Sequence, residues 1–510
     1  MESLKSIYHK CSGERQSFLD RGRDASALTI PSLLPEEGTT SHRRFGTPYQ
    51  SIGARGVNNL ASALLLSLLP PNAPFFRLQI SEETERELES IDPKIVTEVE
   101  DSLANIERSM MDEIERSGVR TGLFDAVRHL VVTGNSLLYF PDGGNMRVVH
   151  LDRYVVKRCP LGFVRMVVLM ESVSPVMLPE AVREKMGADN SYDDHIEMYT
   201  GMVTQMDGKV EVYQEINDEE IEGSRRTMDA EDAPFIPLRM SRVDGENYGR
   251  GYVEQYMGDL QSLEGLTKAI VEGSAAAAKV LFLVNPNGTT RARTLSESPN
   301  GAIREGSAND VSVLQSQKAS DFSVALNTTR DIKERLAYAF LLLEGSIRNA
   351  DRVTAEEVRL VTQAVERQLG GIYSIMSREL SLPLVTLVMN KMKKSGALPN
   401  LPDDKIKPVI ITGIEALGRG NDLNRLDTYL AGIGQILGPE VLQSHIDISE
   451  YLKRRALALG IDTKGLVRSP EELQQMQAMK QQQMMAQQMA PQIAAQMNSG
   501  DQGNVELPEG

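Results

Sequence analysis

A short polar stretch between two long helical patterns constrains the fold of this 510-residue chain more than any other feature. The stretch, residues 344–353, carries Arg348 and Arg352 and runs into Thr354 and Glu357, which are spaced to form a helix-capping box. Apolar residues then recur at helical spacing: Val358, Val361, Val365, Leu369, Ile372, Met376 and Leu380. At about 1.5 Å per residue, a helix over 354–393 would span roughly 60 Å. Such a length predicts a part in a larger assembly.

We expect this helix to bend near Glu379. Gly370-Gly371 is a weak point in the pattern, and Pro383 lacks the backbone N–H that a helix interior needs. The proline ring also clashes with the preceding turn, which is a common cause of a kink.

Composition favours a folded, soluble chain with room for roughly three domains. Hydrophobic residues make up 41% and charged residues 25%, while tryptophan is absent and aromatic residues are only 5%. Leu, Val, Ile and Met must therefore form the cores. The net charge of −16 gives no basis for tight, sequence-independent DNA binding, which depends on clustered Lys and Arg.

Two cysteines, Cys11 and Cys159, are too few for a disulfide framework or a four-ligand zinc site. We expect free thiols in a reducing cytoplasm. The first ten residues lack the apolar core of a signal peptide, and the longest apolar run, residues 60–69, is too short to span a bilayer. The chain is therefore expected to stay in the cytoplasm, without a membrane, unless it leaves as part of a particle.

The pattern up to about residue 250 predicts an α+β region. Residues 1–120 are expected to be mainly helical. Helices are predicted at 53–69, 81–116 and 124–132, and strands at 136–140, 146–150, 163–171, 196–204 and 209–214. The last two strands should form a hairpin around Asp207-Gly208.

Helical spacing returns from residue 253 and ends in the run Ala275–Ala278. Residues 279–320, with the turn Asn285–Gly288, predict a small β insertion, and a second helix follows over 322–340. Helical stretches are expected at 422–436 and 448–459. From Ser469 onward the chain is rich in Gln, Met and Ala, which could be helical in an assembly or disordered alone.

Catalytic motifs are missing from the sequence. It has no phosphate-binding loop and no metalloprotease or serine-hydrolase motif, and the glycines at 432–438 depart from the dinucleotide-binding spacing. His195 and Glu197 lack the cysteine pair of a zinc deaminase. His129 and His150 are expected to be structural. We therefore expect no catalytic residues, no bound metal and no cofactor.

Four arginines remain as candidates for recognition. Arg348 and Arg352 either pair with helix ends or contact a polyanion, because a guanidinium matches the geometry of phosphate. Arg291 and Arg293 are either surface charges on the β insertion or a docking site for an acidic partner.

The order helix, β insertion, helix, loop and long helix resembles the portal proteins of bacteriophages, and specific strings narrow the resemblance. The strings are TIPSLLP at 29–35, TPYQSIGARGVNNLA at 47–61, DGENYGR at 244–250, GDLQSL at 258–263, RVTAEE at 352–357, LGGIYS at 369–374 and GIEALGRG at 413–420. They are similar to the head-to-tail connector of T7-like short-tailed phages. The resemblance covers residues 25–465 and is only compositional over the last forty.

The resemblance implies a mainly helical α+β portal fold, assembled as a ring around a central channel. Its parts would be a wing (1–252), stem helix 1 (253–278), a clip (279–320), stem helix 2 (321–343), a tunnel loop (344–353), a long kinked helix with the wing–crown junction (354–440), and a crown with the C-terminal tail (441–510). Arg348, Asn349 and Arg352 would contact DNA in the tunnel loop. Arg291, Arg293 and Arg304 would dock the terminase and later the tail in the clip.

The resemblance also implies a function without catalysis. A dodecamer at one capsid vertex of the virion, assembled in the host cytoplasm, would start capsid assembly and pass double-stranded DNA during genome packaging and during ejection through a short tail. Its partners would be further copies of itself, the major capsid protein, the scaffolding protein, the terminase large subunit, the tail adaptor and tail tube proteins, and the internal core proteins. The alternatives are a nucleic-acid-processing enzyme and a tail-adaptor ring protein.

Overall fold

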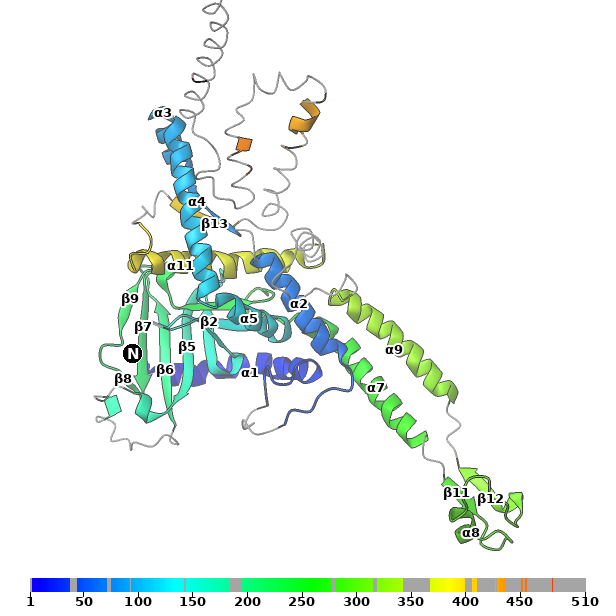
Figure 1. The fold of residues 1–510 in the computed structure, drawn as a ribbon. Coiled ribbons are helices and arrows are strands. Elements are labelled where there is room, and N and C mark those ends of the chain that lie inside the picture. Colours follow the sequence, from blue (N-terminus) through cyan, green and yellow to red (C-terminus); the bar gives the residue numbers. More distant parts are fainter. Residues whose placement is uncertain are drawn as a thin grey trace, which may run out of the picture. The chain divides into compact units, whose positions relative to one another are not determined.

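A computed structural model describes residues 2–36, 44–70, 75–91, 93–141, 144–178, 195–277, 281–314, 319–342, 367–399 and 406–410, with isolated residues elsewhere. Contacts divide the chain into two units, Met1–Ala416 and Leu417–Gly510. Nearly all described residues belong to the first unit, whose helices and sheets are drawn in Figure 1. In the second unit, Asp427, Tyr451 and Arg455 are helical and joined by hydrogen bonds, in agreement with the two helical stretches predicted there.

A helical core contains the helices predicted near the N-terminus, except that the single helix predicted over 81–116 is two helices, with Pro93 at the start of the second. It contains α2 (Ile52–Leu68), α4 (Pro93–Arg116) and α5 (Val119–Thr133), with α3 (Glu82–Ile91) preceding α4. Leu60, Leu64, Met110 and Leu130 are fully buried in one apolar cluster. Gly134 ends α5 with a φ of +78°, where its missing Cβ leaves room for the backbone of Arg250.

The strands predicted between residues 136 and 214 are also present. A six-stranded antiparallel sheet has the order β4-β5-β6-β7-β8, with β9 paired to β7. Its strands are β4 (Tyr154–Arg158), β5 (Val164–Val173), β6 (Ile196–Thr204), β7 (Val210–Ile216), β8 (Glu219–Glu220) and β9 (Arg226–Met228). A three-stranded sheet joins β10 (Phe235–Arg239), β2 (Asn135–Tyr139) and β3 (Arg147–Val149). Gly208 closes the predicted hairpin with a φ of +86°.

Helix α1 (Leu4–Leu28) packs across the large sheet, an element that was not predicted individually. Leu4 is buried against β6, where a Cβ on Gly201 would lie 2.4 Å from its Cδ2 atom. The Leu4 N–H donates to Glu215 of β7 at 2.6 Å. This carboxylate satisfies one of the free amides at the helix N-terminus, so that end of the helix is fixed to the sheet.

Strands β1 (Phe76–Ile80) and β13 (Ile406–Ile410) form a two-stranded sheet that the sequence did not predict. Pro408 is tolerated because a two-stranded sheet consists of edge strands only. Beside it, the Leu78 N–H donates to the buried carboxylate of Glu107 on α4 at 2.7 Å.

The helix that is described from Arg367 onward departs from regular geometry where the sequence predicts a bend. Residues Ser377–Ser381 form a π-helical turn, and α11 (Leu382–Lys394) follows with Pro383 in its first turn. Within the turn, Glu379 pairs with the buried Arg239 of β10. Gly370-Gly371 does not interrupt the helix.

Helix Arg367–Lys394 is the one described helix long and apolar enough to cross a membrane by length and composition. However, 61% of its most apolar window is buried inside the protein. Leu384, Val385 and Met389 pack into the main apolar cluster. The helix therefore has the burial of a core helix.

The remaining elements lie between residues 151 and 339. They are the 3₁₀ turns Leu151–Arg153, Pro175–Met177, Ala230–Asp232, Val253–Tyr256 and Ala308–Asp310, the helices α7 (Met257–Ala277), α8 (Ala292–Ser296) and α9 (Ala319–Ala339), and the strands β11 (Leu281–Val284) and β12 (Val311–Leu314). Both cysteines are free thiols, as predicted.

The buried carboxyl group of Glu107 should make stability depend on pH. Burial raises the pKa of Glu107. Between the pKa of the unfolded chain and that of the folded chain, the folded chain therefore retains a proton that the unfolded chain has lost. The free energy of unfolding falls as pH rises through this range. Glu107→Gln keeps an acceptor for Leu78 without the buried charge. We expect it to match the wild type near pH 4 and to be the more stable protein near pH 7, measured by denaturant unfolding. Glu107→Ala should lose about 1–3 kcal/mol at either pH, because the amide is left without an acceptor. Equal pH profiles for wild type and Glu107→Gln would contradict this account.

Gly56 of α2 allows a close approach between α2 and the end of α9. A Cβ at Gly56 would lie 2.6 Å from Cγ of Phe340, which is fully buried. Gly56→Ala is therefore expected to lower the free energy of unfolding by about 1–3 kcal/mol through overpacking. Gly265→Ala in α7 is the matched control, since nothing lies within 4 Å of that Cβ position. The control should gain up to about 1 kcal/mol from helix propensity. Equal effects of the two substitutions would show that the contact with Phe340 is not limiting.

Candidate functional site

Two long helices carry a small β module between them, in the order that the sequence predicts. Figure 1 shows α7 and α9 side by side, with β11, α8 and β12 at their far end. Near the core, Leu260 and Leu263 of α7 and Ile332 and Leu336 of α9 are buried in the main apolar cluster. Arg335 also pairs with Asp259 at 3.0 Å. We call this helix pair the arm.

Among the described residues, the outer half of the arm is only partly covered by the rest of the chain. No described residue of α7 after Leu263 is buried. On α9, the apolar side chains of Val324 and Leu326 are 67% and 52% exposed. Exposed apolar side chains along a helix pair are compatible with a surface for protein contacts.

The β module is held together by hydrogen bonds around Asp310. Strand β11 pairs with β12 in antiparallel register, from Leu281 opposite Leu314 to Val284 opposite Val311. The Asp310 carboxylate accepts hydrogen bonds from the N–H groups of Thr290 at 3.0 Å and Thr289 at 2.8 Å. These donors hold the pKa of Asp310 below its ordinary value. The loop after β11 is therefore fixed to the start of β12.

The module presents large apolar side chains to solvent. Phe282 is 61% exposed and Ile303 is 98% exposed, and Leu283 and Leu295 are also exposed. The module is too small to bury these groups by itself. This arrangement is typical of a protein-docking surface.

The three arginines predicted as docking residues all lie on this module and are exposed. Arg291 precedes α8, Arg293 pairs with Glu297 at 3.0 Å, and Arg304 donates to the Ser298 hydroxyl at 3.0 Å. The arginines thus surround a short helix instead of a β-hairpin surface. Acidic residues balance them: Glu297, Glu305 and Asp310 lie on the same module. The module is neutral and partly apolar, so charge alone does not define its partner.

The predicted DNA-contacting residues Arg348, Asn349 and Arg352 lie outside the described residues, as does the predicted capping box of Thr354 and Glu357. The end of α9 that precedes them is described, and three side chains hold it.

Asn59 of α2 donates to the carbonyls of Phe340 at 3.0 Å and Leu341 at 3.1 Å. Tyr252 donates to the Ala339 carbonyl at 2.9 Å, and Gln368 donates to the same carbonyl at 3.0 Å. Free carbonyls at a helix C-terminus need such donors. Leu341, with a φ of +57°, turns the chain out of the helix.

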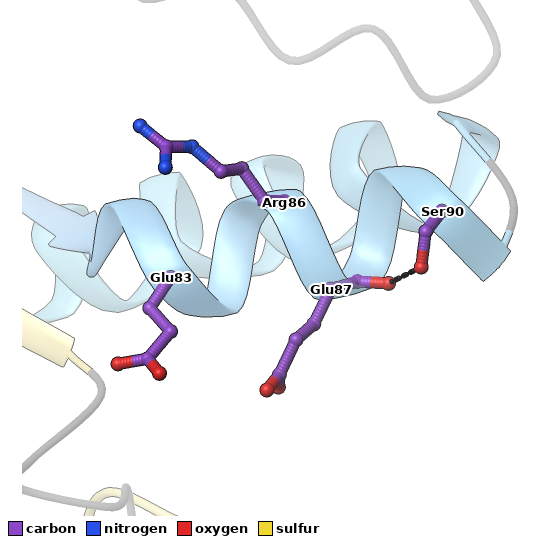
Figure 2. Close-up of a pocket in the computed structure, with 4 residues that line it drawn as sticks. All are labelled: Glu83, Arg86, Glu87 and Ser90. Carbon is purple, nitrogen blue, oxygen red and sulfur yellow. Dashed lines mark hydrogen bonds between the residues drawn. The ribbon is translucent and has the colours of Figure 1, made fainter.

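Among the residues described, neither the pair of His129 and His150 nor the hollow on α3 forms a catalytic or metal-binding arrangement. The rings of His129 and His150 are 4.6 Å apart, and burial lowers the pKa of His129 to about 3, so the side chain is neutral. A hollow of about 590 Å³ lies along α3. Figure 2 shows that Glu83 and Glu87, which line it, point away from Arg86. The described residues contain no group of three or more metal ligands.

The sequence did not single out the most exposed candidates, Phe282 and Ile303. Phe282 lies in an apolar run that predicts a buried strand, and a two-stranded module leaves one face of such a strand open. Ile303 stands alone between polar residues, so no periodicity marks it.

Known proteins match this chain over nearly its whole length. Residues 1–467 match the family described as bacteriophage head to tail connecting protein. The portal protein of Escherichia phage T7 is 39% identical over 492 residues, which cover 95% of this chain and 91% of that protein. The portal protein of Enterobacteria phage T3 is 39% identical over 481 residues, covering 93% and 89%. The portal protein of Enterobacteria phage SP6 is 29% identical over 507 residues, covering 98% and 94%.

The predicted resemblance is thereby confirmed. The match over residues 1–467 and the identity to two relatives across more than nine-tenths of the chain show that the protein belongs to the bacteriophage head to tail connecting proteins, the family of the portal proteins.

Proposed function

We propose that twelve copies of this portal protein form a ring at one capsid vertex, through which double-stranded DNA enters during packaging and leaves during ejection. The observation that carries the proposal is the arm, whose outer half exposes Val271, Val324 and Leu326 in the single chain. Neighbouring arms around a channel would cover these rows. The relatives named above are portal proteins, which supports the same role.

In this proposal the parts of the chain divide the work. Residues 1–252 form the wing, and α7 and α9 form the stem around the channel. The β module is the clip, whose exposed Phe282, Leu283 and Ile303 dock the terminase during packaging and the tail afterwards. Residues 441–510 form the crown. The major capsid protein, the scaffolding protein and the internal core proteins contact the wing and the crown.

Net charge suits a channel that DNA must pass without sticking. Each copy carries a charge of −16, so a ring surrounds DNA with negative potential that repels phosphate. Arg348, Asn349 and Arg352 would then contact the DNA backbone at isolated points around the channel. The chain itself hydrolyses no ATP in this scheme, because the packaging motor supplies the energy.

Electron microscopy of the purified full-length protein tests the ring directly. Class averages along the ring axis are expected to show a central channel with twelve subunits. The same preparation should show no ATPase and no metal-dependent nuclease activity. A monomer or dimer at high concentration would overturn the ring, and a nuclease activity that follows the protein through purification would overturn the non-catalytic role.

Arginines of the tunnel loop give a second test. Arg348→Ala combined with Arg352→Ala removes two guanidinium groups per subunit while the stem stays unchanged. Rings of normal size are expected, with a loss of DNA packaging or retention in particles that carry the variant. Lys333→Ala on α9 is a control that removes one exposed charge elsewhere. Normal packaging and retention in the double variant would contradict the proposed DNA contact.

A further inference from the structure

An extended segment lies along one face of α7. In this segment, residues 44–51, the N–H groups of Tyr49 and Gln50 donate to the two carboxylate oxygens of Glu264 at 2.9 and 3.1 Å. The Tyr49 hydroxyl donates to Glu272 at 3.2 Å, and Lys268 Nζ lies 6.0 Å from the centroid of the Tyr49 ring. Residues 264, 268 and 272 are four apart and share one face of the helix. We call residues 44–51 the strap.

The strap turns cationic and aromatic groups outward. Phe45 and Tyr49 are 42% and 47% exposed, and Arg44 is exposed as well. Among the residues that the structure describes, neither Arg44 nor Lys268 takes part in an ion pair. We define Arg44, Phe45, Tyr49 and Lys268 as the strap face.

Helix α9 has an outer face of complementary composition. Val324, Asp331 and Tyr338 recur every seven residues, close to two full turns, so they form one row. Glu334 lies beside this row. Asp331 and Glu334 are exposed, and within the described ranges neither is paired, in contrast to Arg335 with its partner Asp259. We define Val324, Asp331, Glu334 and Tyr338 as the α9 face.

The two faces lie on opposite flanks of the arm. On α7, Leu260 and Leu263 are buried in the main apolar cluster, and a Cβ at Gly273 would lie 2.7 Å from the ring of Phe322 on α9. The strap binds about a third of a turn away from this contact, further round α7. On α9, Ile332 and Leu336 mark the buried side of the helix, and Tyr338 lies more than half a turn further round.

We propose that the strap face of one subunit docks against the α9 face of a second copy of this chain. The proposal rests on the ring proposed above and identifies the contact that closes its stem. Arg44 and Lys268 meet Asp331 and Glu334, while Phe45 and Tyr49 cover Val324 and Tyr338. Two different surfaces on opposite flanks make a heterologous contact, and repetition of such a contact around an axis generates a ring. Opposite charges set the order of the neighbours.

Charge reversal in full-length protein separates this contact from other ways of closing a ring. Variant A carries Asp331→Lys and Glu334→Lys, and variant B carries Arg44→Glu and Lys268→Glu. Each variant alone brings like charges together at every contact, and we expect at least about a tenfold drop in the fraction of rings at fixed concentration. Ring content is measured by sedimentation and electron microscopy.

Mixing the two variants gives the decisive result. In an equimolar mixture, the reversed α9 face of A meets the reversed strap face of B, and the unchanged faces meet at the next contact. Rings with alternating subunits should form, and a single chain with all four substitutions should form rings as well. Lys333→Glu is the matched control, because it reverses a charge on another face of α9 and should leave rings intact.

Other outcomes overturn the proposal in distinguishable ways. If A or B alone forms as many rings as the wild type, the strap contact is wrong while the proposed ring stands. The same holds if A and B melt like the wild type by circular dichroism but neither their mixture nor the fourfold variant forms rings. If the wild type itself forms no ring, the proposed function fails first. A loss of rings in the Lys333→Glu control would show a general effect of charge, which also overturns the specific contact.

Discussion

Burial of Phe340 connects the arm to the rest of the protein. The ring packs against Gly56 of α2 and against Tyr252 and Tyr256, while the carbonyls around it accept hydrogen bonds from Asn59 and Gln368. The buried ring and the hydrogen-bonded carbonyls belong to the same helix end. A substitution that moves the ring therefore also disturbs these hydrogen bonds. These contacts of Phe340 fix the direction in which α9 leaves the core, and hence the position of the β module.

Local patterns predicted most elements whose partners are near in sequence. The buried stripe of α4 follows from helical periodicity, and the hairpin follows from its strand pattern together with the turn residues Asp207-Gly208. Strands β1 and β13 were missed because they pair across more than three hundred residues, and each is only five residues long. Helix α1 was not singled out because Arg15 interrupts its apolar stripe, although its guanidinium is buried through hydrogen bonds to Tyr8 and Tyr154.

The order of the elements that form the candidate site was predictable from the sequence. The exposed apolar side chains of the site were not. The order of helix, module and helix follows from the sequence, and it places Arg291, Arg293 and Arg304 on one module. Their exposed apolar neighbours follow from tertiary structure, because a strand's pattern does not state which face stays uncovered. The strap could not be predicted for a similar reason. Its backbone amides donate to Glu264, more than two hundred residues away, and every residue type except proline has such an amide, so the sequence does not mark which ones form this contact.

The π-helical turn at Ser377–Ser381 determines the rotational register between the helix segment that contacts the arm and the segment that packs into the core. Such a turn amounts to an α-helix with one inserted residue. Upstream of it, Gln368 holds the end of α9, and downstream α11 packs into the core, with Glu379 pinned to Arg239 between them. Removing one residue here would rotate the upstream helix by roughly 100° and shift it by about 1.5 Å. The turn therefore sets the rotational register between the upstream helix and α11, and a change of length there would turn Gln368 away from the end of α9.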